Sequence, residues 1–175
     1  MNDLVFPAPL PPRLPVRGSR ARFPLRRIFC VGRNYAAHAK ELGAEAARDA
    51  PFFFTKSCFA AVAAGGAVAY PPATCNYQYE LELVIAIGAR AFRIAPGDAL
   101  SIVFGYACGL DMTRRDLQLA ARRQGKPWDM GKDVEESAIV GLIAPASDFT
   151  PDATRRLRRS VDGERRQDAA LGEMI

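Results

Sequence analysis

The chain has 175 residues, of which 49% are hydrophobic and 25% are charged, and it carries a formal net charge of +5. This length suits one domain with a real core, and the apolar fraction is too high for a disordered chain. No apolar run approaches the roughly 20 residues of a membrane-spanning helix, and prolines interrupt the N-terminal region where a signal peptide would be continuously apolar, so we expect a cytoplasmic protein with no membrane partner.

The first 27 residues are rich in proline and arginine and predict an extended arm. Five prolines between residues 7 and 15 exclude a helix there, because proline lacks the amide hydrogen that a helix needs. The apolar residues 27–31 then predict a short strand that ends at Gly32.

The next stretch combines helix formers with an aromatic strand candidate. Residues 35–42, YAAHAKEL, favour a helix, and Gly43 is a suitable position for its end. Residues 52–55 are mostly aromatic and predict a short strand, whereas residues 60–66 are small and predict a loop.

The strongest strand signal covers residues 79–87. The sequence YELELVIAI first alternates and then becomes wholly apolar, and Gly88 ends it. This pattern predicts a central strand with one end near a polar site. A turn at residues 96–98 then precedes a short predicted helix at residues 99–104.

A second apolar strand is predicted at residues 105–110, immediately before Asp111. A helix is expected to follow over residues 113–123, with Asp111 or Thr113 as its N-terminal cap. Gly125 is expected to end this helix.

The remaining sequence predicts a loop and two further strands. Residues 127–138 form the predicted loop, and the apolar residues 139–145 form the first strand. The second strand, residues 157–161, precedes an Asp162-Gly163 pair that is typical of hairpin turns. With 14 glycines and 13 prolines, the chain favours such short elements over a helical bundle.

The cysteines and the basic residues indicate no disulfide, zinc or nucleic-acid site. None of the four cysteines lies in a Cys-x-x-Cys pair and the chain has one histidine, so we expect isolated buried thiols. The densest basic cluster, within residues 155–159, has no interleaved aromatic side chains that could stack on bases. We therefore expect a solvated basic face and no nucleic-acid partner.

Three acidic residues lie at the ends of the two apolar strands. Glu80 and Glu82 are two positions apart, so their side chains project from the same face, and Asp111 follows the second strand. Carboxylates beside apolar neighbours repel one another, and a hard divalent cation such as Mg²⁺ or Mn²⁺ would relieve that repulsion. The alternative is a solvated edge strand whose acids face water, and the spacing alone leaves both interpretations open.

His38 and Glu41 lie three positions apart on the predicted helix and therefore share a face. A carboxylate can orient an imidazole and raise its basicity, so that the other ring nitrogen can take a proton from water. The alternative is an exposed helical ion pair. Because His38 is the only histidine in the chain, any histidine base must be this residue.

Two lysines and one arginine are candidates for binding an anion. Lys56 follows the aromatic strand and Lys132 follows a glycine, and either could reach an anionic substrate as a point charge. Arg33 follows a predicted strand and a glycine, and it is a candidate carboxylate clamp. In each case the alternative is a solvated surface side chain.

Together these segments resemble the fumarylacetoacetate hydrolase family in its acylpyruvase branch. Their order and spacing also match, and the resemblance covers nearly all of the chain from residue 21 onward. The proline-containing arm and the PWDMGK segment are most similar to bacterial fumarylpyruvate hydrolases. The segments that carry the resemblance are CVGRNYAAHAKELG (30–43), PFFFTKS (51–57), YELELVIAIG (79–88), GYACGLDMTRRDLQ (105–118), GKPWDMGK (125–132) and VDGERRQD (161–168).

The resemblance implies an α+β, mainly β fold, a mixed β-sandwich roll with short helices that forms a homodimer. It implies an N-terminal arm at residues 1–26 and a catalytic domain at residues 27–175. Members of the family continue beyond the position of Ile175 with further strands and a loop that closes the pocket. On this comparison we expect the chain to lack the C-terminal part of the fold.

The resemblance also assigns roles to the candidate site residues. It implies that the three carboxylates hold one Mg²⁺ or Mn²⁺ and that His38 and Glu41 activate a water molecule. Lys132 would contact the enolate or carboxylate of the substrate. The residues implied around the substrate pocket are Arg33, Tyr35, Lys56 and Gln118.

The implied reaction is hydrolysis of a C–C bond in an acylpyruvate, a small 2-oxo acid, with fumarylpyruvate as the expected substrate. Water would attack the distal carbonyl, and the bond would break because the departing group is a pyruvate enolate held by the metal and a lysine. Two alternatives remain at this point. One is oxaloacetate decarboxylation or 2-oxo acid isomerisation, and the other is a truncated chain that keeps the ligands without activity.

Overall fold

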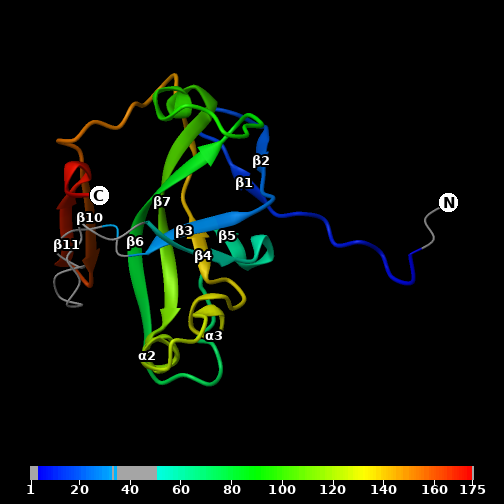
Figure 1. Ribbon diagram of the computed structural model, residues 1–175, viewed down its shortest axis with the longest axis vertical. Coiled ribbons are helices and arrows are strands. Elements are labelled where there is room, and N and C mark those ends of the chain that lie inside the picture. The colour runs from blue at the N-terminus through cyan, green and yellow to red at the C-terminus, as the bar shows by residue number, and fades with distance from the viewer. Residues whose placement is uncertain (1–3, 33, 35–50, 175) are drawn as a thin grey trace.

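The computed structural model describes residues 4–32, 34 and 51–174. Strands dominate it, and the helices are few and short (Figure 1). Among the described residues, no helix has the length and apolarity needed to cross a lipid bilayer. The expected α+β, mainly β architecture is confirmed.

Most of the described strands are short, and one pair of long antiparallel strands lies among them. The strands are β1 (Arg13–Pro15), β2 (Arg22–Pro24), β3 (Ile28–Gly32), β4 (Phe52–Lys56), β5 (Ala61–Ala63), β6 (Tyr77–Ile87), β7 (Val103–Arg114), β8 (Ala138–Val140), β9 (Ala144–Pro145), β10 (Arg156–Val161) and β11 (Glu164–Ala170). The α-helices are α2 (Arg115–Arg123) and α3 (Asp129–Lys132), and 3-10 turns cover Cys58–Ala60, Pro96–Ile102 and Leu171–Glu173.

The long pair β6 and β7 forms the centre of the molecule, as Figure 1 shows. It belongs to a five-stranded sheet in which β8 and β9 also pair with β7, and β5 pairs with β8 in parallel. The register runs from Tyr77 opposite Arg114 to Ile87 opposite Val103. Side chains that alternate along β6 therefore separate cleanly onto two faces of the sheet.

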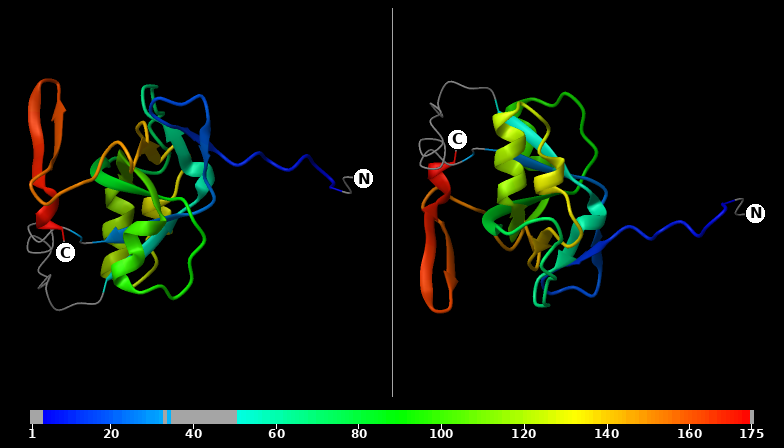
Figure 2. Two further views of the ribbon diagram at one scale, coloured as in Figure 1. Left: turned by 90° about the horizontal axis from the view of Figure 1, so that it is seen from above. Right: turned by 90° about the horizontal axis from the view of Figure 1, so that it is seen from below.

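Each face of this pair packs against different elements. On one face Ala86 and Ala107 pack with Leu14 and Ile143, which are 3% and 0% exposed. On the other face Leu81 packs with Leu157 from β10 and with Leu171. Figure 2 shows the β10–β11 hairpin standing apart as a separate layer beside the sheet. The core is thus divided by β6 and β7.

The hairpin turn between β10 and β11 forms at the predicted position. Asp162 and Gly163 both have positive φ angles, 51° and 81°, which suit the twist of a two-residue hairpin. The hairpin is tied to β6 by Arg159, which donates a hydrogen bond of 2.7 Å to the carbonyl of Tyr79. Its guanidinium also lies 4.2 Å from the ring centroid of Tyr79.

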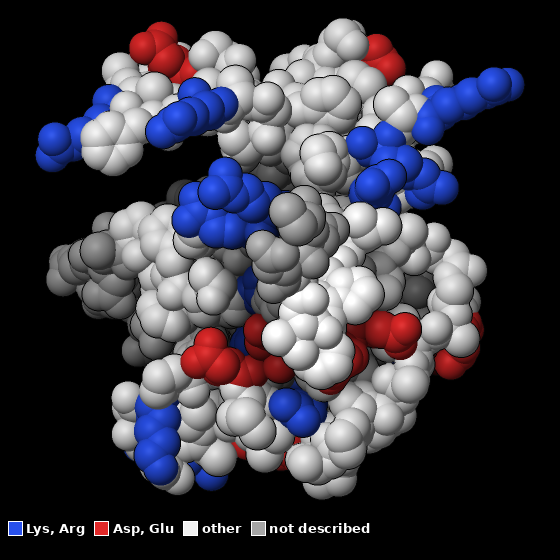
Figure 3. All heavy atoms as spheres, turned by 90° about the vertical axis from the view of Figure 1, so that its right-hand side faces the viewer, with Lys and Arg blue, Asp and Glu red and all other residues white. Residues whose placement is uncertain are grey.

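Two of the four arginines of the basic cluster within residues 155–159 pair with one carboxylate, Asp168. Arg156, Arg158 and Arg165 all form ion pairs with Asp168, and the interactions with Arg156 and Arg158 lower the pKa of that carboxyl. The opposite side of the molecule, the face shown in Figure 3, carries both basic and acidic side chains. The side chains of Arg155, Arg156 and Arg158 are 59%, 38% and 58% exposed, which agrees with the expected solvated face.

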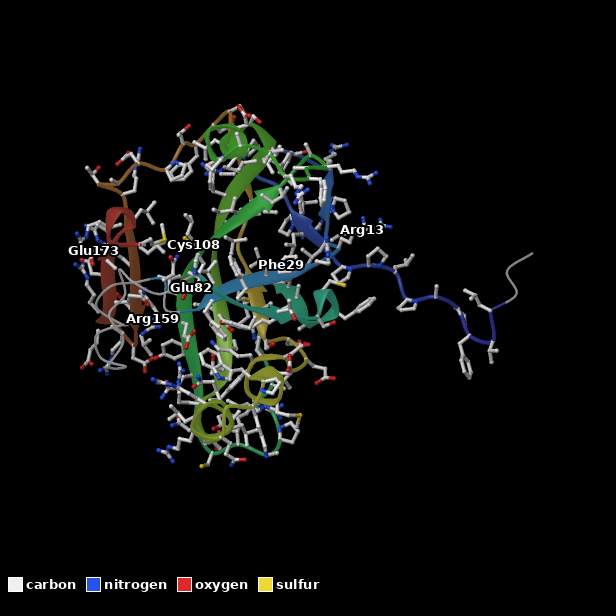
Figure 4. The ribbon with its side chains drawn as sticks, viewed as in Figure 1. Arg13, Phe29, Glu82, Cys108, Arg159 and Glu173 are labelled. Carbon is white, nitrogen blue, oxygen red and sulfur yellow. The ribbon has the colours of Figure 1, made fainter. Side chains whose placement is uncertain are left out.

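The four cysteines are all free, as predicted, but they are not all buried. Cys75 and Cys108 are exposed, whereas Cys30 and Cys58 are partly buried. Cys108 lies on β7 opposite Leu83 and is labelled in Figure 4. The prediction of isolated buried thiols was therefore wrong for Cys75 and Cys108.

The predicted strands at residues 27–31, 52–55, 79–87 and 157–161 are confirmed within one or two residues as β3, β4, β6 and β10. The strand expected at residues 105–110 is longer, because β7 follows its partner β6 as far as Arg114.

Extension of β7 changes the start of the next helix. Helix α2 begins at Arg115, and its cap position, Arg114, makes no side-chain cap hydrogen bond. The predicted caps Asp111 and Thr113 were wrong, because both residues lie within β7 and belong to its ladder with β6.

Three segments for which the sequence predicted no helix or strand contain short strands or a short helix. The predicted loop at residues 60–66 contains β5, and that at residues 127–138 contains α3. The proline-rich arm contains the β1–β2 hairpin, which forms because Leu14 can enter the core. The predicted helix at residues 35–42 lies outside the described residues.

Candidate active site

The three predicted carboxylates come from neighbouring positions on β6 and β7. Glu80 is directly opposite Asp111, and Glu82 is opposite Gly109. Because Glu80 and Glu82 are two apart and cross-strand partners share a face, all three carboxylates lie on one face of the sheet; Glu82 is labelled in Figure 4. The side chains of Glu80 and Asp111 are 23% and 10% exposed. Strand β6 ends the main strand order of its sheet, but these acids do not face water as a solvated edge would require.

Lys132 lies between two of these carboxylates. Helix α3 brings its Nζ to 2.7 Å from Glu80 Oε2 and 2.8 Å from Asp111 Oδ2. Lys132 is only 2% exposed, and its Nζ also lies 4.9 Å from the ring centroid of Phe54. The predicted catalytic lysine is therefore a buried cation that bridges two acids on different strands.

Lys56 approaches the same site from β4 and is 3% exposed. Its Nζ lies 2.9 Å from Asp111 Oδ1 and donates hydrogen bonds of 3.0 Å to the carbonyl of Met112 and the hydroxyl of Ser137. It also donates to the backbone carbonyl of Lys132. Burial lowers the pKa of Lys56, and Asp111 opposes this effect. The ammonium is held by protein oxygen atoms, so Lys56 contributes here by fixing Asp111 and the end of α3.

The structure adds Arg115, a residue that the sequence interpretation missed. Its guanidinium pairs with Glu80 and donates hydrogen bonds to the side-chain oxygens of Gln118 (3.1 Å) and Gln78 (2.9 Å). Gln118 was expected beside the pocket and is 3% exposed, one turn along α2 from Arg115. The available signal was the position of Arg115 four residues after Asp111, at the start of a predicted helix.

Aromatic rings cover one side of the lysine site. The ring centroid of Trp128 lies 4.8 Å from that of Phe52 and 5.8 Å from that of Phe54. Because Trp128 immediately precedes α3 and both phenylalanines are on β4, these rings connect the segment that carries Lys132 to the strand that carries Lys56. Aromatic contacts of this geometry help to fix the position of both lysines.

The charge of Glu82 is the least compensated of the three, because Lys132 lowers its pKa only in part. Burial, followed by the charges of Glu80 and Asp111, raises its pKa to about 7. Burial also opposes ionisation of Glu80, but Lys132 and Arg115 outweigh it and lower the pKa of that group. Among the described side chains, none forms a hydrogen bond or ion pair with Glu82. The site therefore contains one acid that is poised to gain a cation or a proton.

The donor chemistry of this face fits a divalent cation. Three carboxylates provide the hard oxygen ligands that Mg²⁺ and Mn²⁺ prefer, and the raised pKa of Glu82 reflects negative charge that a cation would neutralise. Within residues 4–32, 34 and 51–174, no three acidic, histidine or cysteine side chains are already arranged as metal ligands. Instead, the ammonium of Lys132 lies between Glu80 and Asp111.

The remaining predicted site residues lie outside the part of the chain that the structure describes. These are the candidate water-activating pair His38 and Glu41 and the candidate pocket residues Arg33 and Tyr35. Their roles stay predictions.

Replacing Glu82 by glutamine is expected to stabilise the protein when divalent cations are removed by a chelator. A pKa raised from 4.5 to about 7 means that the folded state binds more protons than the unfolded state within this window, so stability falls as pH rises through it. The difference corresponds to about 3 kcal/mol above pH 7. Urea unfolding at pH 5 and pH 8 should show a fall for the wild type and a flatter profile for Glu82→Gln. An equal fall in both proteins would contradict this assignment.

Replacing Gly131 by alanine is expected to disturb the site through the backbone. A Cβ at Gly131 would lie 2.7 Å from the amide nitrogen and 2.8 Å from the Cα of Gln118, so α3 would have to move away from α2. Overpacking of this kind costs about 1–3 kcal/mol, and the displacement would carry Lys132 with it. The control is Gly97→Ala, because Gly97 has open space around it. Thermal unfolding should separate the two variants, and equal melting temperatures would contradict the prediction.

Comparison with known proteins relates this arrangement to a family. Residues 27–175 match the family model described as the C-terminal domain of fumarylacetoacetate hydrolase. A fumarylpyruvate hydrolase of Ralstonia sp. is 46% identical over 124 residues, which are 71% of this chain and 64% of that protein. A mitochondrial oxaloacetate tautomerase of Arabidopsis thaliana is 36% identical over 149 residues, which are 85% of this chain and 66% of that protein. The chain thus spans slightly less than two thirds of each of these relatives.

A solved structure gives the same relationship in three dimensions. The crystal structure of fumarylpyruvate hydrolase from Pseudomonas aeruginosa in complex with Mn²⁺ and pyruvate matches with a TM-score of 0.93 and 45% sequence identity. The match covers 98% of this chain and 76% of that one.

Proposed function

The chain belongs to the fumarylacetoacetate hydrolase family, and from this premise we propose that it hydrolyses a C–C bond in an acylpyruvate with the help of Mg²⁺ or Mn²⁺. Fumarylpyruvate is the substrate we propose, with fumarate and pyruvate as products. The observation that carries the proposal is the face of β6 and β7 on which Glu80, Glu82 and Asp111 meet Lys132. The similar Pseudomonas enzyme, crystallised with Mn²⁺ and pyruvate, supports both the metal and the pyruvyl half of the substrate.

Glu80, Glu82 and Asp111 would hold the cation. A bound divalent cation supplies a Lewis acid and a template for the carboxylate and neighbouring oxygen of a 2-oxo acid. Burial and the charges of Glu80 and Asp111 raise the pKa of Glu82, and a bound cation would offset this effect.

Two protein groups would then act on the reactants, a histidine as the base and a lysine ammonium as the stabilising charge. We assign proton removal from water to His38, oriented by Glu41. The water oxygen bonds to the distal carbonyl carbon, the C–C bond breaks, and its electron pair remains on the pyruvate fragment as an enolate. Lys132 would stabilise that negative charge, because a buried ammonium already placed for an anion needs little reorganisation. Protonation of the enolate carbon gives pyruvate.

Sequence similarity to oxaloacetate tautomerases supports a second candidate function, the tautomerisation of oxaloacetate. Several relatives, including the Arabidopsis protein and one from Escherichia coli, are named oxaloacetate tautomerases. Oxaloacetate is also a 2-oxo acid whose enol form could occupy the same carboxylate and lysine site. Tautomerisation requires proton transfer at carbon without attack by water, so it would depend less on a water-activating histidine.

Assays of fumarylpyruvate, acetylpyruvate and oxaloacetate with Mn²⁺ test the proposal. We expect fumarylpyruvate to be hydrolysed with the highest kcat/KM, and we expect Glu82→Gln to lose this activity because it replaces a charged carboxylate ligand with a neutral amide. His38→Ala should lose hydrolysis. Faster enolisation of oxaloacetate, with no hydrolysis, would favour the tautomerase. Absence of all turnover above the Glu82→Gln control would contradict the proposal for this 175-residue chain.

A further inference from the structure

Side chains of the β10–β11 hairpin form hydrogen bonds to the outer edge of β6. Within the described part of the sheet, β6 pairs with β7 alone, so its other edge has no strand beside it. Gln167 on β11 donates a hydrogen bond of 3.1 Å from its Nε2 to the carbonyl of Leu81. Arg159 on β10, labelled in Figure 4, donates one of 2.7 Å to the carbonyl of Tyr79. Two backbone acceptors that an edge strand would leave unpaired are therefore satisfied by the hairpin.

A β-bulge in the hairpin places these two donors on the same face. Arg159 and Gln167 are directly opposite each other in the register, so their side chains project together toward β6. The register shifts between Arg159 and Ser160, which leaves Arg166 as the extra residue of the bulge. Without this residue, Arg166 would lie opposite Arg159, and Gln167 would project from the other face. A bulge beside a functional site commonly redirects a side chain in this way.

The two carbonyls belong to the peptide groups that directly precede Glu80 and Glu82. A peptide group is planar, so a hydrogen bond to its oxygen also restrains the nitrogen and Cα of the following residue. Arg159 therefore restrains the backbone of Glu80, and Gln167 restrains that of Glu82. Glu80 is also held through its carboxylate, which forms ion pairs with two cations. No described side chain holds the carboxylate of Glu82 in this way, so its direction depends more on its backbone.

We propose that Gln167 is a positioning residue for the divalent-cation site, because its hydrogen bond to the carbonyl of Leu81 fixes the backbone that carries Glu82. This role rests on the proposed function only in that the three carboxylates hold a cation. Arg159 has a different emphasis, since its guanidinium also lies 4.2 Å from the ring centroid of Tyr79 and ties the hairpin to β6 by two contacts. Loss of Arg159 should therefore cost more stability, and loss of Gln167 should cost more metal affinity.

Replacing Gln167 by methionine tests this role, because methionine keeps the length of the side chain and removes the donor. We expect calorimetric titration of Gln167→Met to show Mn²⁺ binding weakened about 10-fold, and the electron paramagnetic resonance spectrum of bound Mn²⁺ to change. Gln167→Asn, whose amide is one methylene shorter, should weaken binding in the same direction. Arg159→Met should lose more stability in urea unfolding but weaken Mn²⁺ binding by a smaller factor. The control is Arg158→Met, which removes an exposed arginine of the same hairpin and should leave Mn²⁺ binding unchanged.

The order of the two effects separates a positioning role from a structural one. If the hairpin only stabilises the fold, Mn²⁺ affinity should follow stability, and Arg159→Met should have the larger effect on both quantities. That order, or unchanged Mn²⁺ binding by the Gln167 variants, would overturn the proposal. A wild type that binds no Mn²⁺ would overturn it together with the proposed function. Mn²⁺ binding that depends on Gln167 in a chain without hydrolytic activity would support the positioning role and contradict only the proposed function.

Discussion

Replacing Lys132 by methionine is expected to lower kcat/KM for fumarylpyruvate by about 100- to 1,000-fold and, at the same time, to tighten the binding of Mn²⁺. The ammonium lies 2.7 Å from Glu80 and 2.8 Å from Asp111, so it competes with a metal ion for these carboxylates. Methionine has a similar length and no charge, so it removes both the competitor and the group that stabilises the enolate. Steady-state kinetics and calorimetric titration with Mn²⁺ measure the two effects.

The opposite directions of these effects distinguish a catalytic lysine from a structural one. If Lys132 only holds the fold together, its loss should weaken Mn²⁺ binding and activity in parallel. The control is Lys126→Met, which removes a lysine from an exposed position six residues away and should leave both quantities unchanged. Weaker Mn²⁺ binding by the folded Lys132→Met protein would contradict the assignment.

Replacing Lys56 by methionine is expected to have the largest effect on stability, a loss of about 3–5 kcal/mol. The change would leave Asp111 without its partner at 2.9 Å and would remove three hydrogen bonds to oxygen atoms of residues 112, 132 and 137. These atoms lie inside the protein, where water does not readily replace the lost donor. Urea unfolding followed by circular dichroism measures the loss.

Two comparisons bound this prediction. Lys126→Met should change the free energy of unfolding by less than about 0.5 kcal/mol, because the residue is exposed. Ser137→Ala should cost about 1–3 kcal/mol, since it removes one oxygen from the same group and leaves Lys56 its other partners. A loss below about 1 kcal/mol for Lys56→Met would show that Asp111 and the end of α3 are held in place by other contacts.

Much of the site could be predicted from local sequence patterns. The alternation in residues 79–87 placed Glu80 and Glu82 on one face, and β6 has them there. Lys132 was singled out as a cation after a glycine in a polar segment, and it lies at the carboxylates. Arg115 was missed because its position near the start of a predicted helix, four residues after Asp111, does not by itself identify Glu80 on β6 as its partner.

The partners of each charged side chain depended on contacts between segments far apart in the chain. From its place at the end of a strand, Lys56 was expected to reach an anionic substrate. In the structure its ammonium instead contacts oxygen atoms of the protein within residues 111–137. The predicted cap at Asp111 failed for the same reason, since β6 extends β7 past that residue.

The sequence by itself determined the strands, the Asp162-Gly163 turn and the acidic and basic residues available for chemistry, because side-chain periodicity and turn preferences act over a few neighbouring residues. Only the tertiary structure decided that Glu80 faces Asp111, that Lys132 bridges them and that Glu82 is left without a cation among the described residues. Strand register and burial are set by pairing between segments far apart in the chain, and it is burial that turns three ordinary acids into an electrostatically strained site.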